Sequence, residues 1–137
     1  MVENINILLV DDVEYSREIL RSAIISCIDD NKFPIRPHFF QTGDGTSVIE
    51  IVQHRNIHLI YLDINLAAIT SGLDVLEGVR KIYKDLEVVM CSSESSSDNV
   101  MAAIKNGANG FIVKPFNSGR VSDTLKKYLL KNKLISD

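Results

Sequence analysis

The side chains best suited to chemistry in this sequence stand where short apolar stretches end. In chain order they are Asp11 and Asp12, Asp63, Ser92 and Lys114. Three gathered carboxylates repel one another unless a cation compensates them, and an all-oxygen ligand set suits Mg²⁺ better than Zn²⁺. A lysine ammonium and a serine hydroxyl beside them would bond the oxygens of a phosphoryl group while Asp63 attacks in line. These residue types predict a Mg²⁺-dependent phosphoryl acceptor that forms an acyl phosphate.

The stretch from Ile57 to Leu62 predicts the central strand that would position this chemistry. It is rich in β-branched and aromatic residues and too short for an ordinary helix, which favours a buried strand. In an open parallel sheet, ligands bind outside the carboxyl ends of the strands, where Asp63 would lie. The first expected strand, Ile5 to Val10, also ends on acids. If these two strands are neighbours, the three carboxylates share one crevice.

Strand patterns alternate with helical patterns along the whole chain. The expected strands are residues 5–10, 37–42, 57–62, 87–91 and 111–113, and Pro37 restricts the second to an edge or a strand start. The intervening helical stripes include Ile19, Ile82 and Ile104 among the residues expected to face the core. Gly107 is expected to end the fourth helix in a left-handed conformation. The alternation predicts an α/β fold: a flavodoxin-like, doubly wound, five-stranded parallel sheet of order 2-1-3-4-5 with five helices.

Length and composition predict one soluble domain. The 137 residues are expected to form a single domain whose core spans about residues 5–130, with residues 131–137 frayed. A net charge of −3 with dispersed lysines predicts no nucleic-acid binding. No stretch has the length of a membrane span or the pattern of a signal peptide. Cys27 and Cys91 are expected to be buried free thiols, which suits a cytoplasmic protein.

The sequence resembles the receiver domain of two-component response regulators over essentially its whole length. The matching pieces are LLVDD at 8–12, LDIN at 62–65, GLDVL at 72–76, Ser92 after a hydrophobic strand, and GANGFIVKPF at 107–116. An acid pair or a lone strand-end Asp is a weak signal by itself. Five pieces in order at receiver spacing are a strong one.

The resemblance implies a role for each residue at the strand ends. Asp63 would accept phosphate from a phosphohistidine on a sensor histidine kinase or a histidine phosphotransfer protein. Mg²⁺ would be bound by Asp12, Asp63 and the backbone carbonyl of Asn65, while Asp11 would act mainly through a coordinated water. Lys114 would pair with the phosphate, and its peptide bond to the following proline would be cis. The protein would then be no enzyme beyond catalysing its own phosphorylation and dephosphorylation.

The resemblance also implies residues that change conformation on phosphorylation and residues that set the lifetime of the phosphate. Ser92 would swing to bond the phosphate and Phe111 would turn inward behind it. This would reshape the surface of the fourth helix, fifth strand and fifth helix, where an unknown output protein docks. Asn65 and Glu94 would flank the phosphate and set its lifetime. Polar residues at both positions predict a short-lived signal.

The sequence departs from the receiver pattern after Asp63. Leu66-Ala67-Ala68 replaces the usual Met-Pro step, and Gly72 follows Asp63 by nine residues where receivers have eight. One inserted residue is therefore expected, and it would alter the shape that a phosphodonor recognises without removing the chemistry. The segment from Asp29 to Ile35 also looks longer than the usual turn.

Three other functions remain open at this point. A receiver fold kept only as a docking module would never be phosphorylated. A haloacid-dehalogenase-like phosphatase would need a second Asp two residues after Asp63, where Asn65 stands. A flavodoxin-type FMN binder would need a phosphate loop after the first strand, where Asp11 and Asp12 would repel the phosphate. Within signalling, chemotaxis, a phosphorelay and control of another enzyme are all compatible, although Phe111 stands where chemotaxis regulators commonly have Tyr.

Overall fold

The described residues of the computed structural model form a five-stranded parallel sheet with helices on both faces. These residues are 2–66, 71–94 and 96–136. The strands are β1 (Glu3–Val10), β2 (Ile35–Thr42), β3 (Leu59–Asp63), β4 (Glu87–Ser92) and β5 (Gly110–Val113). The helices are α1 (Glu14–Asn31), α2 (Val48–Arg55), α3 (Gly72–Ile82), α4 (Ser97–Lys105) and α5 (Ser118–Lys131), and a short 3-10 turn, η1 (Gly45–Ser47), precedes α2. The strand order β2-β1-β3-β4-β5 confirms the predicted fold.

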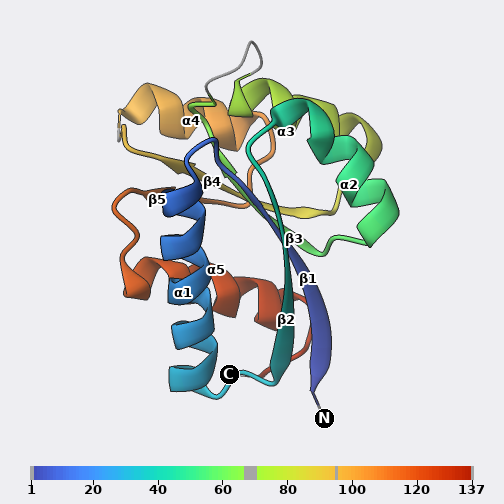
Figure 1. Ribbon diagram of the computed structural model, residues 1–137, viewed down its shortest axis with the longest axis vertical. Coiled ribbons are helices and arrows are strands. Elements are labelled where there is room, and N and C mark those ends of the chain that lie inside the picture. The colour runs from blue at the N-terminus through green and yellow to red at the C-terminus, as the bar shows by residue number, and fades with distance from the viewer. Residues whose placement is uncertain (1, 67–70, 95, 137) are drawn as a thin grey trace.

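Two helical layers cover the sheet (Figure 1). Helices α1 and α5 lie together on one side, and α2, α3 and α4 lie on the other. Each layer has its own apolar cluster against the sheet, and every residue of β3 and β4 is buried. A parallel strand covered on both faces reads as a continuous apolar run, which is why the sequence marked β3 as central.

The strand registers place the ends of four strands at one edge of the sheet. Val10 pairs with Leu62, and Asp63 pairs with Cys91. Ser92 pairs with Val113, the residue before Lys114. The residues at the ends of β3 and β4, and those that directly follow β1 and β5, therefore lie close together, because parallel strands in register end at the same level.

Strand β3 begins two residues later than predicted and includes Asp63. Ile57 is buried but lies outside the strand. The backbone N–H of Asn6 donates to His58 Nδ1 at 2.9 Å, so at this point a side chain replaces the carbonyl of a regular ladder. The ladder with β1 begins at Leu59.

Three residues predicted to face the core instead face solvent. Ile19 is 40% exposed, Ile82 is 54% exposed and Ile104 is 62% exposed. The apolar stripes of these helices are wider than the strip of sheet that each helix covers, so the residue at the margin remains in water. In α3 the buried positions are Gly72, Val75, Leu76 and Val79, and in α4 Ala103 is buried.

The helix ends largely follow the predictions. Gly107 has φ +96°, and the N–H of Ala108 donates to Ala103 O at 2.9 Å, which closes α4 as predicted. The side chain of Asn117 caps α5. In the tail that was expected to fray, residues 131–137, Leu134 and Ile135 are partly buried and pack against the core beside α1 and α5.

Both cysteines are buried free thiols, as predicted. Cys27 Sγ donates to the backbone carbonyl of Ser118 at 3.3 Å and so links α1 to the start of α5. Among residues 2–66, 71–94 and 96–136, no helix combines the length and the apolar character that crossing a membrane requires.

Candidate functional site

Lys114 joins two of the strand-end acids at the carboxyl edge of the sheet. Its ammonium nitrogen donates to Asp11 Oδ2 at 2.6 Å and to Asp63 Oδ2 at 2.9 Å. Asp11 follows β1, Asp63 ends β3 and Lys114 follows β5, so the contacts connect residues far apart in the chain. The peptide bond between Lys114 and Pro115 is cis, as the resemblance implied.

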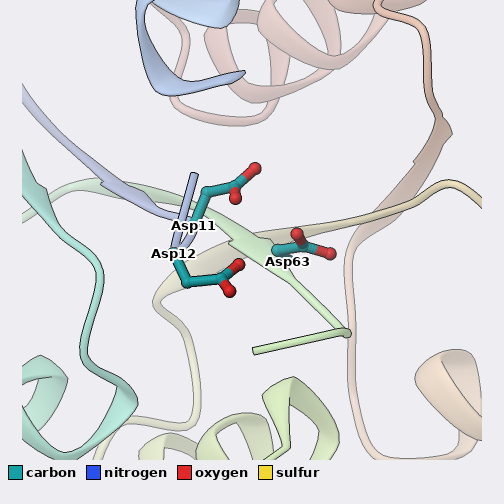
Figure 2. Close-up of side chains that lie close together, drawn as sticks. All are labelled: Asp11, Asp12 and Asp63. Carbon is teal, nitrogen blue, oxygen red and sulfur yellow. The ribbon is translucent and has the colours of Figure 1, made fainter. Parts of the chain in front are cut away.

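Three carboxylates form a compact cluster at this edge (Figure 2). Asp11, Asp12 and Asp63 each offer an oxygen within 4.8 Å of the others. Asp63 is 5% exposed and Asp11 is 6% exposed, whereas Asp12 is exposed to solvent. The cluster is therefore half buried and open on the side of Asp12, which leaves an approach for a ligand from solution.

Burial and the lysine act in opposite directions on the two buried acids. Burial raises the pKa of Asp63, and the hydrogen bond from Lys114 offsets only part of that rise. Burial also acts to raise the pKa of Asp11, but hydrogen bonds from Lys114 and from the N–H of Val13 outweigh it, so the pKa of Asp11 is lowered. For Lys114, burial acts to lower the pKa, and hydrogen bonds to Asp11 and Asp63 outweigh it and raise that pKa. Of the two buried acids, Asp63 is thus the one whose negative charge the surrounding groups stabilise less.

The carboxylate cluster fits a hard divalent cation. Its donors are all oxygens, and an ionised carboxylate has about four lone-pair sites, of which Asp63 uses one on each oxygen toward Asn65 N–H and Lys114. The cluster carries more negative charge than Lys114 neutralises. Oxygen ligands, water access and excess negative charge are the conditions under which Mg²⁺ binds through one or two carboxylates.

Ser92 lies beside the cluster, fully buried at the end of β4. Its Oγ accepts from the N–H of Glu94 at 3.0 Å and from Asn65 Nδ2 at 3.4 Å. The hydroxyl proton is thereby left to donate. Both residues predicted to flank the phosphate therefore donate a hydrogen bond to Ser92, Asn65 from its side chain and Glu94 from its backbone. The carboxylate of Glu94 also accepts from Asn99 Nδ2 at 3.3 Å.

Phe111 lies in β5 and is partly buried. It packs against the apolar cluster that α2, α3 and α4 form with the sheet. Of the segment predicted to carry an inserted residue, Leu66 is described and buried. Ala67 and Ala68 lie outside the described residues.

Arg17 is a site residue that the sequence reasoning missed. Its Nη1 donates to the backbone carbonyl of Asp11, and its Nε donates to Gln41 Oε1 at 3.0 Å. The available signal was positional, since an arginine one turn into the helix that follows an acid pair is able to reach back over that pair. Phe116 was also missed, and its ring centroid lies 5.9 Å from Lys114 Nζ.

Gly72 shapes the site from behind, because it packs against the backbone of Asp63. A Cβ at position 72 would lie 2.0 Å from the Asp63 carbonyl oxygen, whereas a Cβ at Gly78 in the same helix meets nothing within 4 Å. We expect Gly72→Ala to lower the free energy of unfolding by about 1–3 kcal/mol through forced backbone movement. Gly78→Ala should instead raise it by about 0.5–1 kcal/mol, since alanine is the better helix former. Urea unfolding of both variants measures this contrast, and equal effects would contradict it.

Comparisons with known proteins agree on one family. The model of the response regulator receiver domain matches residues 7–126. The chemotaxis protein CheY of Bacillus subtilis is 28% identical over 123 residues, which make up 90% of this chain and 96% of that protein. The regulatory protein LuxO of Vibrio parahaemolyticus is 33% identical over 89 residues, which make up 65% of this chain and 19% of LuxO.

Solved structures show the same architecture. The crystal structure of the receiver domain of NtrX from Brucella abortus has a TM-score of 0.74 and 28% identity, and the match covers 90% of this chain and 97% of that one. The REC domain of AraT, a response regulator from Geobacillus stearothermophilus, has a TM-score of 0.78 at 20% identity, covering 93% of this chain and 95% of that one, and supports the fold alone. The family match over most of the chain establishes that this protein belongs to the response regulator receiver domains of two-component signalling.

Proposed function

We propose that this receiver domain takes a phosphoryl group onto Asp63 from a phosphohistidine of a sensor histidine kinase or a histidine phosphotransfer protein. The observation that carries the proposal is the position of Lys114, whose ammonium lies 2.9 Å from Asp63 Oδ2 and 2.6 Å from Asp11 Oδ2. A cation placed against the nucleophile and a second acid would meet the oxygens of an incoming phosphoryl group. A purely structural ion pair needs no third and fourth partner, yet Asp12 and Ser92 lie at the same edge.

The reaction requires an ionised Asp63. A carboxylate oxygen of Asp63 attacks phosphorus, the bond from phosphorus to the histidine nitrogen breaks, and its electron pair returns to the imidazole. Burial raises the pKa of Asp63, but Lys114 and the Asn65 N–H favour the charged form and keep the nucleophile available. Asp12, Asp63 and the backbone carbonyl of Asn65 would hold Mg²⁺, with Asp11 acting mainly through a coordinated water, and the bound ion would supply positive charge to neutralise the transferred group.

Lys114 and Ser92 are proposed to exchange partners as the phosphoryl group arrives. Lys114 would move from the carboxylate oxygens to a phosphoryl oxygen. Ser92, already buried and accepting two hydrogen bonds, would donate its hydroxyl proton to another. Phe111 would follow by packing deeper behind Ser92, and this movement would change the neighbouring surface.

The output partner is proposed to dock on α4, β5 and α5. Exposed apolar side chains on this face include Met101 and Ile104 on α4 and Val113 on β5. Exposed apolar groups that gather on one face commonly mark protein interaction sites. A cytoplasmic location is part of the same proposal, since buried free thiols suit a reducing compartment.

Acetyl phosphate tests the proposed chemistry directly. The intact protein is incubated with acetyl phosphate and Mg²⁺, and its mass is measured before and after. We expect the mass of one phosphoryl group to appear, to map to Asp63 and to disappear when EDTA replaces Mg²⁺. An unchanged mass would mean that the domain serves as a docking module without phosphorylation.

The lifetime of the acyl phosphate should depend on Asn65 and Glu94. Both side chains are exposed and polar, and Asn65 Nδ2 and the backbone N–H of Glu94 both donate to Ser92 Oγ, so the two residues lie beside the proposed phosphate site, where they would admit or orient an attacking water. We expect the double variant Asn65→Leu with Glu94→Leu to lose phosphate at least about tenfold more slowly, because groups that position a reacting water contribute factors of this size or larger. Decay is followed by mass after removal of the phosphodonor. Ser93→Ala, at the exposed neighbouring position, is the control, and an unchanged decay rate in the double variant would contradict the proposed role.

A further inference from the structure

The side chain of Arg17 ties together three segments around the acid pair. It extends from the first turns of α1, and its guanidinium donates from Nη1 to the carbonyl of Asp11 and from Nε to Gln41 Oε1 at 3.0 Å. Gln41 lies near the end of the edge strand β2, and its own amide donates to Glu18 Oε1 at 3.3 Å. The backbone of Asp11 is thereby linked through one side chain to both a helix and an edge strand.

The guanidinium and the backbone of Asp12 also both border Gly43. A Cβ at Gly43 would stand 3.4 Å from both Arg17 Nη1 and the Cα of Asp12, so these groups fill the space over Gly43 at ordinary contact distance. The start of α1 is also held to the side chain of Asp11. Its N-cap residue, Val13, has no side chain able to cap, and the N–H of Val13 instead donates to Asp11 Oδ1 at 2.9 Å.

We propose that Arg17 is a positioning residue for the metal site, holding the turn of Asp11 and Asp12 in the geometry that Mg²⁺ requires. The inference rests on the proposed function. Mg²⁺ demands near-ideal octahedral geometry, so its affinity depends on carboxylates that are placed before it arrives. The positive charge of Arg17 by itself opposes a second cation nearby. Its contribution is therefore the pair of hydrogen bonds, which a charge-conserving substitution removes.

Titration of the metal-free protein with Mg²⁺ by calorimetry provides the test. We expect Arg17→Lys to bind Mg²⁺ about tenfold more weakly than the wild type, the lower end of the loss seen when groups that orient metal ligands are changed. Lysine keeps the charge but lacks the planar fork that serves Asp11 and Gln41 together. Gln41→Ala, an exposed position away from the carboxylates, removes the outer anchor of Arg17 and should weaken binding in the same direction by a smaller factor.

Arg21→Lys is the matched control. Arg21 lies one turn further along α1, and its guanidinium stacks 5.2 Å from the ring centroid of Phe39 in the same edge strand. We expect its Mg²⁺ affinity to equal that of the wild type. Unfolding temperatures in EDTA separate positioning from plain stability, because a merely structural tie would lower the unfolding temperature of Arg17→Lys and leave its Mg²⁺ affinity unchanged. That result would overturn the inference about Arg17 but would leave the proposed phosphorylation of Asp63 unaffected. A wild-type protein that binds no Mg²⁺ would overturn both proposals.

Discussion

Asp63→Asn should take up no phosphoryl group from acetyl phosphate under conditions in which the wild type is modified. Asparagine keeps the size of the side chain and one of its two hydrogen-bond acceptors but has no carboxylate nucleophile, so the acyl phosphate has no oxygen on which to form. The variant should still fold, because Lys114 retains its 2.6 Å contact with Asp11. Circular dichroism and intact mass on the same samples measure both expectations.

Two further substitutions separate loss of the nucleophile from loss of a metal ligand and from loss of a distant acid. Asp12→Asn keeps the nucleophile but removes a proposed Mg²⁺ ligand, so it should be phosphorylated slowly and require more Mg²⁺. Asp29→Asn changes an exposed acid at the far end of α1 and should behave as the wild type does. Phosphate found on Asp63→Asn at any residue, in an amount matching the wild type, would contradict the assignment of Asp63.

Lys114→Met should lose about 1–3 kcal/mol of unfolding free energy at neutral pH without Mg²⁺. Removing one member of a buried ion pair costs about 3–5 kcal/mol, and the 19% exposure of the Lys114 side chain reduces this through solvent screening. Asp11, Asp12 and Asp63 would then face one another with no cation among them. Mg²⁺ should restore more stability to this variant than to the wild type, because it supplies the missing positive charge.

The pH dependence of this loss follows from the signs of the pKa shifts. The pKa of Lys114 is raised, so its contribution is fully present below the ordinary value of about 10.4 and is lost as pH rises through the folded-state pKa. The pKa of Asp11 is lowered, so its contribution is present above about pH 4 and is lost as pH falls through the folded-state value. The difference between Lys114→Met and the wild type should therefore shrink toward acid pH, where the carboxylates become neutral.

Lys131→Met is the matched control for charge loss. Lys131 Nζ lies 2.7 Å from the buried Glu87 at the opposite end of β4, far from the carboxylate cluster. This variant should also be destabilised in urea unfolding, but Mg²⁺ should not restore its stability selectively. Equal stability of Lys114→Met and the wild type without Mg²⁺, or equal restoration of both variants by Mg²⁺, would contradict the assigned role of Lys114.

The sequence by itself determined the fold and the residues that meet at the sheet edge. Continuous apolar runs ending on Asp11, Asp63, Ser92 and Lys114 imply parallel strands covered on both faces, and parallel strands direct the residues that follow them to one edge. The cap at Gly107 was also local information, because glycine adopts positive φ without the steric cost that a Cβ imposes.

Only the tertiary structure decided which apolar residues at the edges of the helices are exposed to solvent and which groups from distant parts of the chain form hydrogen bonds. Ile19, Ile82 and Ile104 fit the helical period, but the period does not state how wide a strip of sheet each helix covers. The hydrogen bonds of Arg17 to Asp11 and of Asn6 to His58 join segments whose relative placement follows from packing the whole sheet. Local patterns specify elements and their faces, whereas contacts between side chains of different elements depend on distances that exist only after those elements have packed.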